Sequence, residues 1–561
     1  MKYQLRIFLF ISYIFFSLPK SDIAAQAIPV GSIQDQQMKI QLLLSDTLAV
    51  SPVFRPFSQV QYYELMTYRD NSNGWWNRII NKKKLFETDG VTVGIQPFML
   101  QNTYNSRFPY SENNGAAWYG RGSTTEFQTG LFIESKYVTF TVHPHIIYQQ
   151  NKDFLEPRYT FDVTTPFINE IGGNIDAPIR FGPNSYSTFD WGNSSLRFRY
   201  HKFETGISNE PLWWGGANRY PLMMSTNAPG VPHFFIGTRE GVSIPYFGNI
   251  NFKWLMGYPR ESGYFGGVGS GIPRFMNTAN ISYTPKIFRN LTLGVTRTYH
   301  IYEDDGFKLS NVFLLFDPVR RSSLVERQGE DDIRQARNQM ASAYFHLKIP
   351  AANAEIYAEF FREDHSFDFR DLLIQPHHNS AYSIGFQKIS YTPWVDFIKT
   401  NVEITNLTTS QLNQVRPQAF FYSHDPVIQG HTNRGQILGA AIGPGSNSQF
   451  FGLDAFKNNY KFGFFAQRIA DNDNLHLREG SASNALSANF GDYFRHRVNL
   501  NFGLNFLYGP GPFYINSRLV WTKAYNYGRF DYGRLDGFNA TNYDRNDRTN
   551  VQFQIGLTYI L

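Results

Sequence analysis

The stretch "VNLNFGLNFLY", Val498–Tyr508, alternates between two kinds of side chain. Large apolar residues stand at nearly every second position, and asparagine or glycine fills most of the positions between them. Because a strand projects successive side chains to opposite faces, this segment predicts a β-strand with one apolar and one polar face. Alternation alone fits either a soluble β-sandwich or a membrane β-barrel, since both folds separate such faces.

The same alternation recurs along the chain. Residues 138–143, 196–201 and 355–360 each set apolar side chains against polar or charged ones. The final segment, "VQFQIGLTYIL", repeats the pattern and runs to the last residue, Leu561. Such a closing strand is similar to the C-terminal signal of outer-membrane barrels, although a terminal phenylalanine is more typical of that signal.

The lengths of the connections between the predicted strands distinguish the β-barrel from the β-sandwich. "GPGP", Gly509–Pro512, is a tight turn, whereas residues 522–550 form a long polar connection. Short and long connections that alternate are typical of outer-membrane barrels, which have tight periplasmic turns and long extracellular loops. The sequence therefore predicts an all-β fold, a transmembrane antiparallel β-barrel. The mean hydropathy of −0.37 agrees with it, because a barrel shows lipid only every second residue.

Composition excludes several other classes of protein. The chain has 561 residues, of which 17% are aromatic, and it contains no cysteine. Disulfides, thiolate chemistry and a lipid anchor on an N-terminal cysteine are therefore impossible. The formal net charge of +6 comes without the dense Lys/Arg blocks of a nucleic-acid-binding protein, so no nucleic-acid partner is expected.

Residues 1–27 have the features of an export signal. Basic Lys2 and Arg6 precede an apolar run over 7–18, and an A-x-A-like site ends at Ala27. The apolar run is too short to span a membrane comfortably, which disfavours the alternative of an anchor. Cleavage after Ala27 would remove three basic residues and one acidic residue, and the net charge would fall from +6 to +4.

Residues 28–85 differ from the strands that follow. Ser32 and Asp35 have capping-box spacing ahead of apolar residues at helical spacing, and a second helix is expected over about 58–68. These helices are too short to cross a bilayer. We expect 28–85 to form a helical periplasmic element against or inside the mouth of a barrel made by 86–561.

The long connection "GISNEPLWWGGANRYPLMMSTNAPGVPHFF", residues 206–235, has no periodicity and allows two interpretations. In the first, Trp213 and Trp214 offer flat faces to sugar rings, while Asn209, Glu210 and Arg219 supply hydrogen bonds and charge. In the second, the same residues plug the barrel, with Arg219 paired to Glu210 or to a carboxylate in the lumen. The two interpretations can hold together.

Several acidic and basic groups could bind a charged glycan or a divalent ion. Asp471 and Asp473 have the spacing of Ca²⁺ ligands in a loop, but a full EF-hand loop is missing. We therefore expect ion pairs between strands and loops, and neither a metal nor a cofactor. The groups concerned are Arg362, Asp364, His365, Arg468, Asp471 and Asp473.

Five ordered motifs resemble those of the capsule assembly proteins called Wzi. They are "WYGRG" (118–122), "NEPLWWG" with "NAP" and "PH" (209–233), "FREDH" with "DLLIQPHHNSAY" (361–382), "HTNRGQILGAAIGPGSNS" (431–448) and "QRIADND" (467–473). The wording "GGANRYPL", residues 215–222, departs from the Gly-Pro that related sequences carry more often, which leaves the glycan specificity open.

The resemblance implies a closed barrel of about eighteen strands, with an N-terminal helical element and a lumen largely blocked by its own loops. It also implies lectin-like, non-catalytic binding of capsular polysaccharide at the cell surface, with outer-membrane lipid and the outer-membrane assembly machinery as further partners. The candidate polysaccharide-binding residues are Asn209, Glu210, Trp213, Trp214, Arg219, Trp118, Arg121, Arg362 and Arg434.

The sequence is also compatible with two other functions. A porin-like channel for polar or anionic solutes would suit strands lined by arginine and asparagine. An outer-membrane hydrolase could use His377 or His378 with Ser380, but no G-x-S-x-G elbow is present.

Overall fold

The computed structural model describes most of the chain after the predicted export signal. Of Phe369 and Leu372 it describes the backbone alone. The described residues are 26–45, 50–66, 74–88, 90–155, 175–265, 271–303, 308–316, 337–363, 369–410, 416, 418, 420–424, 427–474, 496–527 and 546–560.

Eighteen antiparallel spans close into a barrel, because β28 pairs with β5 at the seam. Three spans are interrupted and consist of two strands each, and β4 (Lys84–Glu87) adds a short strand beside β5. The spans are β5 (Val91–Asn105), β6 (Gly122–Ser135), β7 with β8 (Val138–Val142, His145–Gln149), β9 with β10 (Tyr186–Asp190, Ser195–Tyr200), β11 (Phe203–Ser208), β13 with β14 (His233–Thr238, Val242–Ile244), β15 (Gly248–Gly257), β16 (Arg274–Pro285), β17 (Leu291–Tyr302), β18 (Arg337–Ile349), β19 (Ala354–Glu363), β20 (Ser380–Ser390), β21 (Phe397–Asn406), β24 (Asn447–Lys457), β25 (Tyr460–Asp471), β26 (Arg497–Tyr508), β27 (Phe513–Tyr525) and β28 (Arg548–Tyr559).

The predicted alternation is confirmed in the strands. In β26, Asn501 is fully buried towards the lumen, whereas its neighbour Phe502 is 42% exposed on the outside. Val551, Phe553 and Ile555 of β28 are likewise exposed, with Gln552 buried between them. Exposed apolar side chains thus form a belt around the outside of the wall, and polar side chains line the inside.

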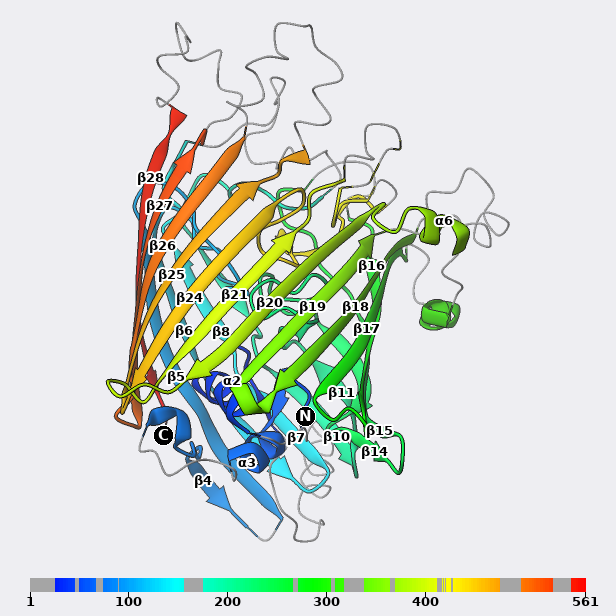
Figure 1. Cartoon of the computed structure of the whole chain (residues 1–561), viewed down its shortest axis with the longest axis vertical. Coiled ribbons are helices and arrows are strands. Elements are labelled where there is room, and N and C mark those ends of the chain that lie inside the picture. The colour runs from blue at the N-terminus through cyan, green and yellow to red at the C-terminus, as the bar shows by residue number, and fades with distance from the viewer. Residues whose placement is uncertain are drawn as a thin grey trace, which may run out of the picture.

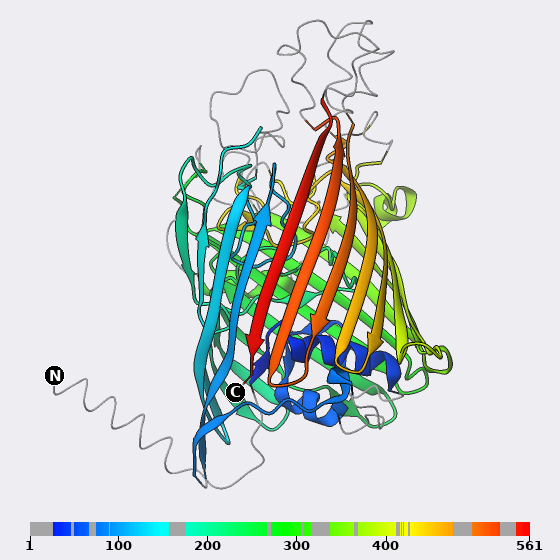
Figure 2. The ribbon, with the colours of Figure 1, turned by 90° about the vertical axis from the view of Figure 1, so that its left-hand side faces the viewer.

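The two ends of the barrel differ in the length of their connections. Tight turns such as 509–512 join strands at one end, here called the turn end, and long connections such as 209–232 and 407–446 join them at the other, the loop end. Figure 1 and Figure 2 show the short helices α2 (Ile33–Leu44) and α3 (Gln59–Met66) at the turn end, near the C-terminus. The predicted alternation of short and long connections is confirmed.

The N-terminal segment packs into the mouth of the barrel at the turn end. The Oγ of Ser32 accepts a hydrogen bond from the backbone N of Asp35 (3.2 Å), which caps α2 as its sequence predicts. Met38 and Leu43 of α2 are buried in a cluster with Phe456 and other apolar residues of the wall. The remaining elements of the segment are β1 (Ala27–Ile28), β2 (Phe54–Arg55), β3 (Phe57–Ser58) and η1 (Trp75–Asn77).

The structure does not decide the predicted boundaries after residues 27 and 85. Residues 1–25 lie outside the described residues, and Ala27 pairs with Ser58, so cleavage after residue 27 stays a prediction. The boundary after residue 85 falls inside β4, and it too stays a prediction. In the part of the chain that the structure describes, no helix is both long enough and apolar enough to span a membrane.

The largest apolar core lies inside the barrel. The connections 209–232 and 407–446 contribute most of it, through residues such as Trp214, Met223 and Tyr422. Inward-facing residues of the wall, including Leu255 and Phe361, complete the cluster. Short elements of the connections are β12 (Trp213–Trp214), β22 (Thr432–Asn433), β23 (Gln436–Ile437), α4 (Leu309–Val312), η2 (Phe313–Phe316), η4 (Pro350–Ala352) and α6 (Phe369–Ile374).

Candidate functional site

Five connections meet at the loop end around an open pocket of about 740 Å³, here called the aromatic pocket. Trp118 comes from the β5–β6 connection, and its ring centroid lies 5.2 Å from that of Phe181. Tyr186 and Tyr264 lie 6.2 and 6.1 Å from Phe181 in the same way. The predicted residue Arg434 lines the same pocket. Two of the predicted residues, more than 300 positions apart in sequence, therefore meet here.

Arg434 is held firmly at the edge of the aromatic pocket. Its Nη1 lies 2.6 Å from Oδ2 of Asp190, and its side chain is still one-third exposed. The other carboxylate oxygen of Asp190 accepts a hydrogen bond from Nδ2 of Asn209 (3.2 Å), so two predicted residues share one carboxylate. Gln436 lines the pocket on the same connection. A guanidinium with part of its surface open can still bind hydroxyl or carboxylate oxygens.

Below the pocket a carboxyl group ties two of the connections together. Asp176 accepts hydrogen bonds from both the backbone N (2.6 Å) and the Oγ (2.5 Å) of Ser262, which lines the pocket. Burial raises the pKa of Asp176, and the two hydrogen bonds from Ser262 oppose that shift. These two hydrogen bonds hold Ser262 in its place in the pocket lining.

Arg121, a further predicted residue, lies at a separate open hollow of about 730 Å³. Arg107 and Arg548 line it together with the rings of Phe108 and Tyr527. The Nε of Arg121 donates to the backbone O of Ser106 (3.2 Å). Three arginines around one hollow make a basic surface that attracts anionic groups.

Trp213 and Trp214 do not face solvent. They form β12, which pairs with β2 so that Trp213 lies opposite Arg55. The guanidinium carbon of Arg55 lies 4.4 Å from the centroid of the Trp213 ring, and its Nη1 lies 3.6 Å from Oδ2 of Asp35. The β11–β13 connection, entering from the loop end, therefore meets the N-terminal segment, entering from the turn end.

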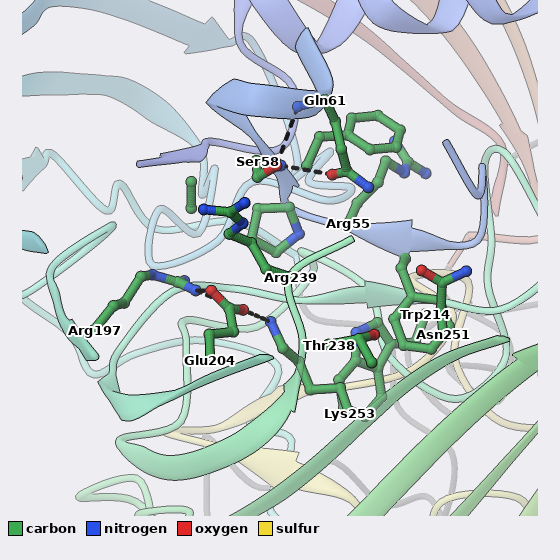
Figure 3. Close-up of a pocket in the computed structure, with 14 residues that line it drawn as sticks. Arg55, Ser58, Gln61, Arg197, Glu204, Trp214, Thr238, Arg239, Asn251 and Lys253 are labelled. Atoms are coloured by element: carbon green, nitrogen blue, oxygen red, sulfur yellow. Dashed lines mark hydrogen bonds and ion pairs between the residues drawn. The ribbon is translucent and has the colours of Figure 1, made fainter. Parts of the chain in front are cut away.

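Glu210 is buried in a row of charges on the inner wall. It pairs with Arg197, whose Nη1 lies 3.0 Å from Oε1 of Glu204, and Lys253 Nζ lies 2.9 Å from the same oxygen. Figure 3 shows Arg197, Glu204 and Lys253 in this row, with Arg239 between it and the N-terminal segment. Every cation in the row has a carboxylate close by, which accounts for the burial of these charges.

Arg219 is also enclosed by protein groups. Its Nη2 lies 2.7 Å from Oε2 of Glu112, and its guanidinium carbon lies 4.2 Å from the centroid of the Phe450 ring. Of the two pairings considered for Arg219, the one with Glu210 is therefore wrong. The structure places Arg219 and the Trp213–Trp214 pair in packing contacts inside the lumen.

Carboxylates of the inner wall hold the connections in place. Glu403 of β21 accepts hydrogen bonds from the backbone N of Asn218 (3.0 Å), Arg219 (2.9 Å) and Tyr220 (2.9 Å). Glu359 of β19 accepts one from the backbone N of Leu222 (3.1 Å). The alternation of 355–360 predicts that Glu359 faces inward, but no sequence signal links it to amides more than 130 residues away.

The remaining predicted residues lie elsewhere. Arg362 shares a face of β19 with Phe360, which is exposed outside the barrel, so it lies on the outer face and not at the aromatic pocket. Asp471 pairs with Arg497 (3.3 Å) and Asp473 with His496 (3.0 Å), as the ion-pair interpretation predicts. Asp364 and His365 lie outside the described residues.

No group of His, Asp and Glu residues with the geometry of a metal site occurs among the side chains that the structure describes. The aromatic pocket also contains residues that the sequence did not single out. Phe181 and Tyr264 belong to long connections rich in aromatic residues, and Tyr186 begins β9 directly after one of them; that composition is the signal that could have found them.

A family profile described as capsule assembly protein Wzi matches residues 100–509. The chain belongs to the Wzi family. The match contains the aromatic pocket, the lumen connections and most of the barrel. The resemblance of the five sequence motifs is confirmed.

Among solved structures, the chain is similar to the Escherichia coli outer-membrane protein Wzi, which is described as a carbohydrate-binding β-barrel involved in group 1 capsule assembly. The two share 11% identity and a TM-score of 0.58, over 96% of this chain and 100% of that one. OprD of Pseudomonas aeruginosa (11% identity, TM-score 0.38, 86% and 97% coverage) and OccAB2 of Acinetobacter baumannii (11%, 0.37, 84% and 98%) are more distant. No curated protein sequence matches the chain.

The Wzi-family chain is an outer-membrane protein. Its barrel carries an outward belt of exposed apolar side chains, among them Phe502, Phe553 and Ile555. Such a belt needs lipid around it. Outer-membrane barrels have tight periplasmic turns and long extracellular loops, so we expect the turn end to face the periplasm and the loop end, with the aromatic pocket, to face the outside.

Proposed function

We propose that this protein binds surface polysaccharide and anchors or assembles the capsule at the cell surface, in a lectin-like and non-catalytic manner. The aromatic pocket is the observation that supports this proposal. The rings of Trp118 and Tyr264 line this pocket together with the partly exposed guanidinium of Arg434. Aromatic faces suit the apolar faces of sugar rings, and the guanidinium suits hydroxyl and uronate oxygens.

The basic hollow beside Arg121 extends the same surface. Asp153 joins the two regions, because its backbone O accepts from Arg121 and its Oδ1 lies 2.6 Å from Nη1 of Arg180, the neighbour of Phe181. A long anionic polymer could thus contact rings at one place and cations at the other. Spreading weak contacts over two sites raises the overall affinity for a polymer.

The packed lumen supports anchoring rather than transport. The N-terminal segment and the β11–β13 connection meet at β2 and β12, and we propose that they plug the barrel from its two ends. The N-terminal helices then lie on the periplasmic side. The candidate residues Asn209, Glu210, Trp213, Trp214 and Arg219 act in this plug, and they support the pocket from within.

A porin-like channel remains a second candidate because one side of the lumen is hollow. A hollow of about 1910 Å³ that is open to solvent lies between α2 and the β5–β6 connection, and polar side chains that include Gln101, His145 and Arg518 line it. Single-channel recording separates the two functions. A plugged barrel gives little or no current in a planar bilayer, whereas steady conductance would favour the channel.

Deletion of the gene tests the anchoring role. Polysaccharide should then appear in the medium while its synthesis continues, and re-expression of the wild-type chain should return it to the cells. Polymer that stays on the deletion cells would contradict the proposal. Purified protein should leave the chain length of the polymer unchanged, as expected for a non-catalytic binder.

A further inference from the structure

Part of the connection between β17 and β18 lies against the outside of the barrel. Residues 308–316, here called the outer flap, comprise α4 and η2 and lie over β16 and β17; Figure 1 shows this short green helix outside the wall. Leu314 of the flap packs against Phe275, Tyr299 and Ile301. These three wall residues share faces with exposed belt residues, yet the flap leaves them at most 5% exposed.

Polar groups on the outer wall hold the flap. Nδ2 of Asn277 donates to the backbone O of Asn311 (2.9 Å) and of Val312 (2.9 Å), and its Oδ1 accepts from Nε1 of Trp254 (2.7 Å). Nη1 of Arg297 donates to the backbone O of Leu315 (2.7 Å). Asparagine and arginine on the outer face of a barrel are costly in lipid unless such bonds satisfy them.

The opposite face of the flap is apolar and uncovered. Leu309, Phe313 and Phe316 are 68%, 55% and 73% exposed, and Lys308 is the one charged residue of the segment. Isolated exposed apolar side chains are ordinary, but three on one short segment, beside an apolar belt, indicate a contact surface.

The height of the flap along the wall indicates which surroundings cover its apolar face. Asn277 is the fourth residue of β16, so at a rise of ~3.4 Å per residue and a tilt of ~40° it lies about 8 Å below the extracellular end of the strand. Further along the same wall, Ile281 and Val295 belong to the exposed belt. The flap is therefore continuous with the surface that contacts the membrane.

We propose that the outer flap is an interfacial membrane anchor whose Leu309, Phe313 and Phe316 are covered by acyl chains of the outer leaflet. Short amphipathic segments that place leucine and phenylalanine at the boundary of headgroups and chains bind membranes in this way. The anchor holds residues 308–316 against the bilayer, beside the wall.

Because the chain has no cysteine, single labels test the anchor in the full protein. A nitroxide on Phe313→Cys, in phosphatidylcholine–phosphatidylglycerol vesicles, should collide readily with oxygen and poorly with a water-soluble nickel chelate. Val295→Cys in the belt and Lys152→Cys in an extracellular connection provide the lipid and water references. Contact with the chelate equal to that of the Lys152 label would overturn the proposal.

Two further measurements exclude other coverings. Asn277→Leu removes the bonds that hold the flap, so the label on Phe313→Cys should shift towards the water reference while the barrel keeps its heat-resistant migration on a gel. If Asn277→Leu does not fold, the Phe313→Cys measurement still decides the question. Dipolar broadening between labels on neighbouring copies would assign the face to a second copy of this chain, and the lipid anchor would be rejected.

Discussion

Two sites in the long connections each combine tryptophan with a nearby arginine, but one site is buried in the lumen and the other lines an open pocket. Trp214 is 1% exposed, in a ladder with the N-terminal segment, whereas Trp118 lines the open aromatic pocket. Each site has an arginine close by: Arg55 lies over the ring of Trp213, and Arg434 stands at the edge of the aromatic pocket. The difference is that Arg55 is enclosed with Asp35, while Arg434 keeps one-third of its side chain open.

The comparison separates two uses of aromatic residues in one barrel. Inside the lumen, rings fill space between charged groups that are already paired, so their removal should weaken the fold. At the loop end, rings line a pocket that is open to solvent, so their removal should weaken binding and spare the fold. Each prediction below tests one side of that division.

The largest effect is expected at Glu403. Glu403→Gln should cost about 3–5 kcal/mol, because the buried carboxylate accepts three successive backbone N–H groups and the hydroxyl of Tyr357 (2.8 Å), and each hydrogen bond to a charged acceptor contributes about 1.5–3 kcal/mol. Protease cleavage within 215–222 and the appearance of bilayer conductance would measure the loosened connection. Glu87→Gln, at a half-exposed side chain of β4, is the matched control and should change neither. An uncleaved, non-conducting Glu403→Gln barrel would contradict the assigned role.

A smaller loss is expected where the two halves of the lumen packing meet. Arg55→Gln removes the cation over Trp213 and the ion pair with Asp35, and it should cost about 2–3 kcal/mol. The N-terminal segment should become accessible to protease, and polysaccharide affinity should stay at the wild-type value. Loss of affinity without loss of protection would show that the two tryptophan sites are not independent.

At the aromatic pocket, a substitution should reduce polysaccharide affinity more than it reduces the stability of the fold. Trp118→Ala should lower polysaccharide affinity about thirtyfold, or ~2 kcal/mol, through loss of ring burial, with little change in stability. Isothermal titration of the folded protein with capsular polysaccharide measures the change. Trp394→Ala, a ring 79% exposed at a periplasmic turn, is the matched control and should bind normally. Equal losses in both variants would remove the aromatic pocket from the binding surface.

The sequence predicted the wall well and the site in part. Alternation depends on neighbouring residues alone, so it placed Phe502 outside and Asn501 inside correctly. It could not show that β12 pairs with β2, because that contact joins residues about 160 positions apart. For the same reason, residue type suggested binding for Trp213 and Trp118 alike, and burial, which depends on the whole fold, distinguishes them.

The smallest effect on the lumen packing is expected from a fall in pH. Nε2 of His431, in the connection 407–446, donates to the backbone O of Met223 (2.7 Å), and its Nδ1 lies 2.8 Å from Nε2 of His300. Burial, reinforced by the charge of Arg274, lowers the pKa of His431 from 6.5 to about 4. The unfolded connection therefore binds a proton more tightly than the packed one, and the packing is fully stable above about pH 6.5 and weakens as the pH falls towards 4.

At pH 5.5 the population of loosened connection should rise about tenfold, which hydrogen exchange of 427–433 measures. His431→Gln keeps a donor and an acceptor but does not titrate, so its exchange should vary less with pH. The effect stays inside the lumen: exchange at the aromatic pocket, whose rings do not titrate in this range, should change less than exchange beside His431. Equal acid loosening at both places would mean that the enclosed and the open regions respond as one unit, and the division between them would fail.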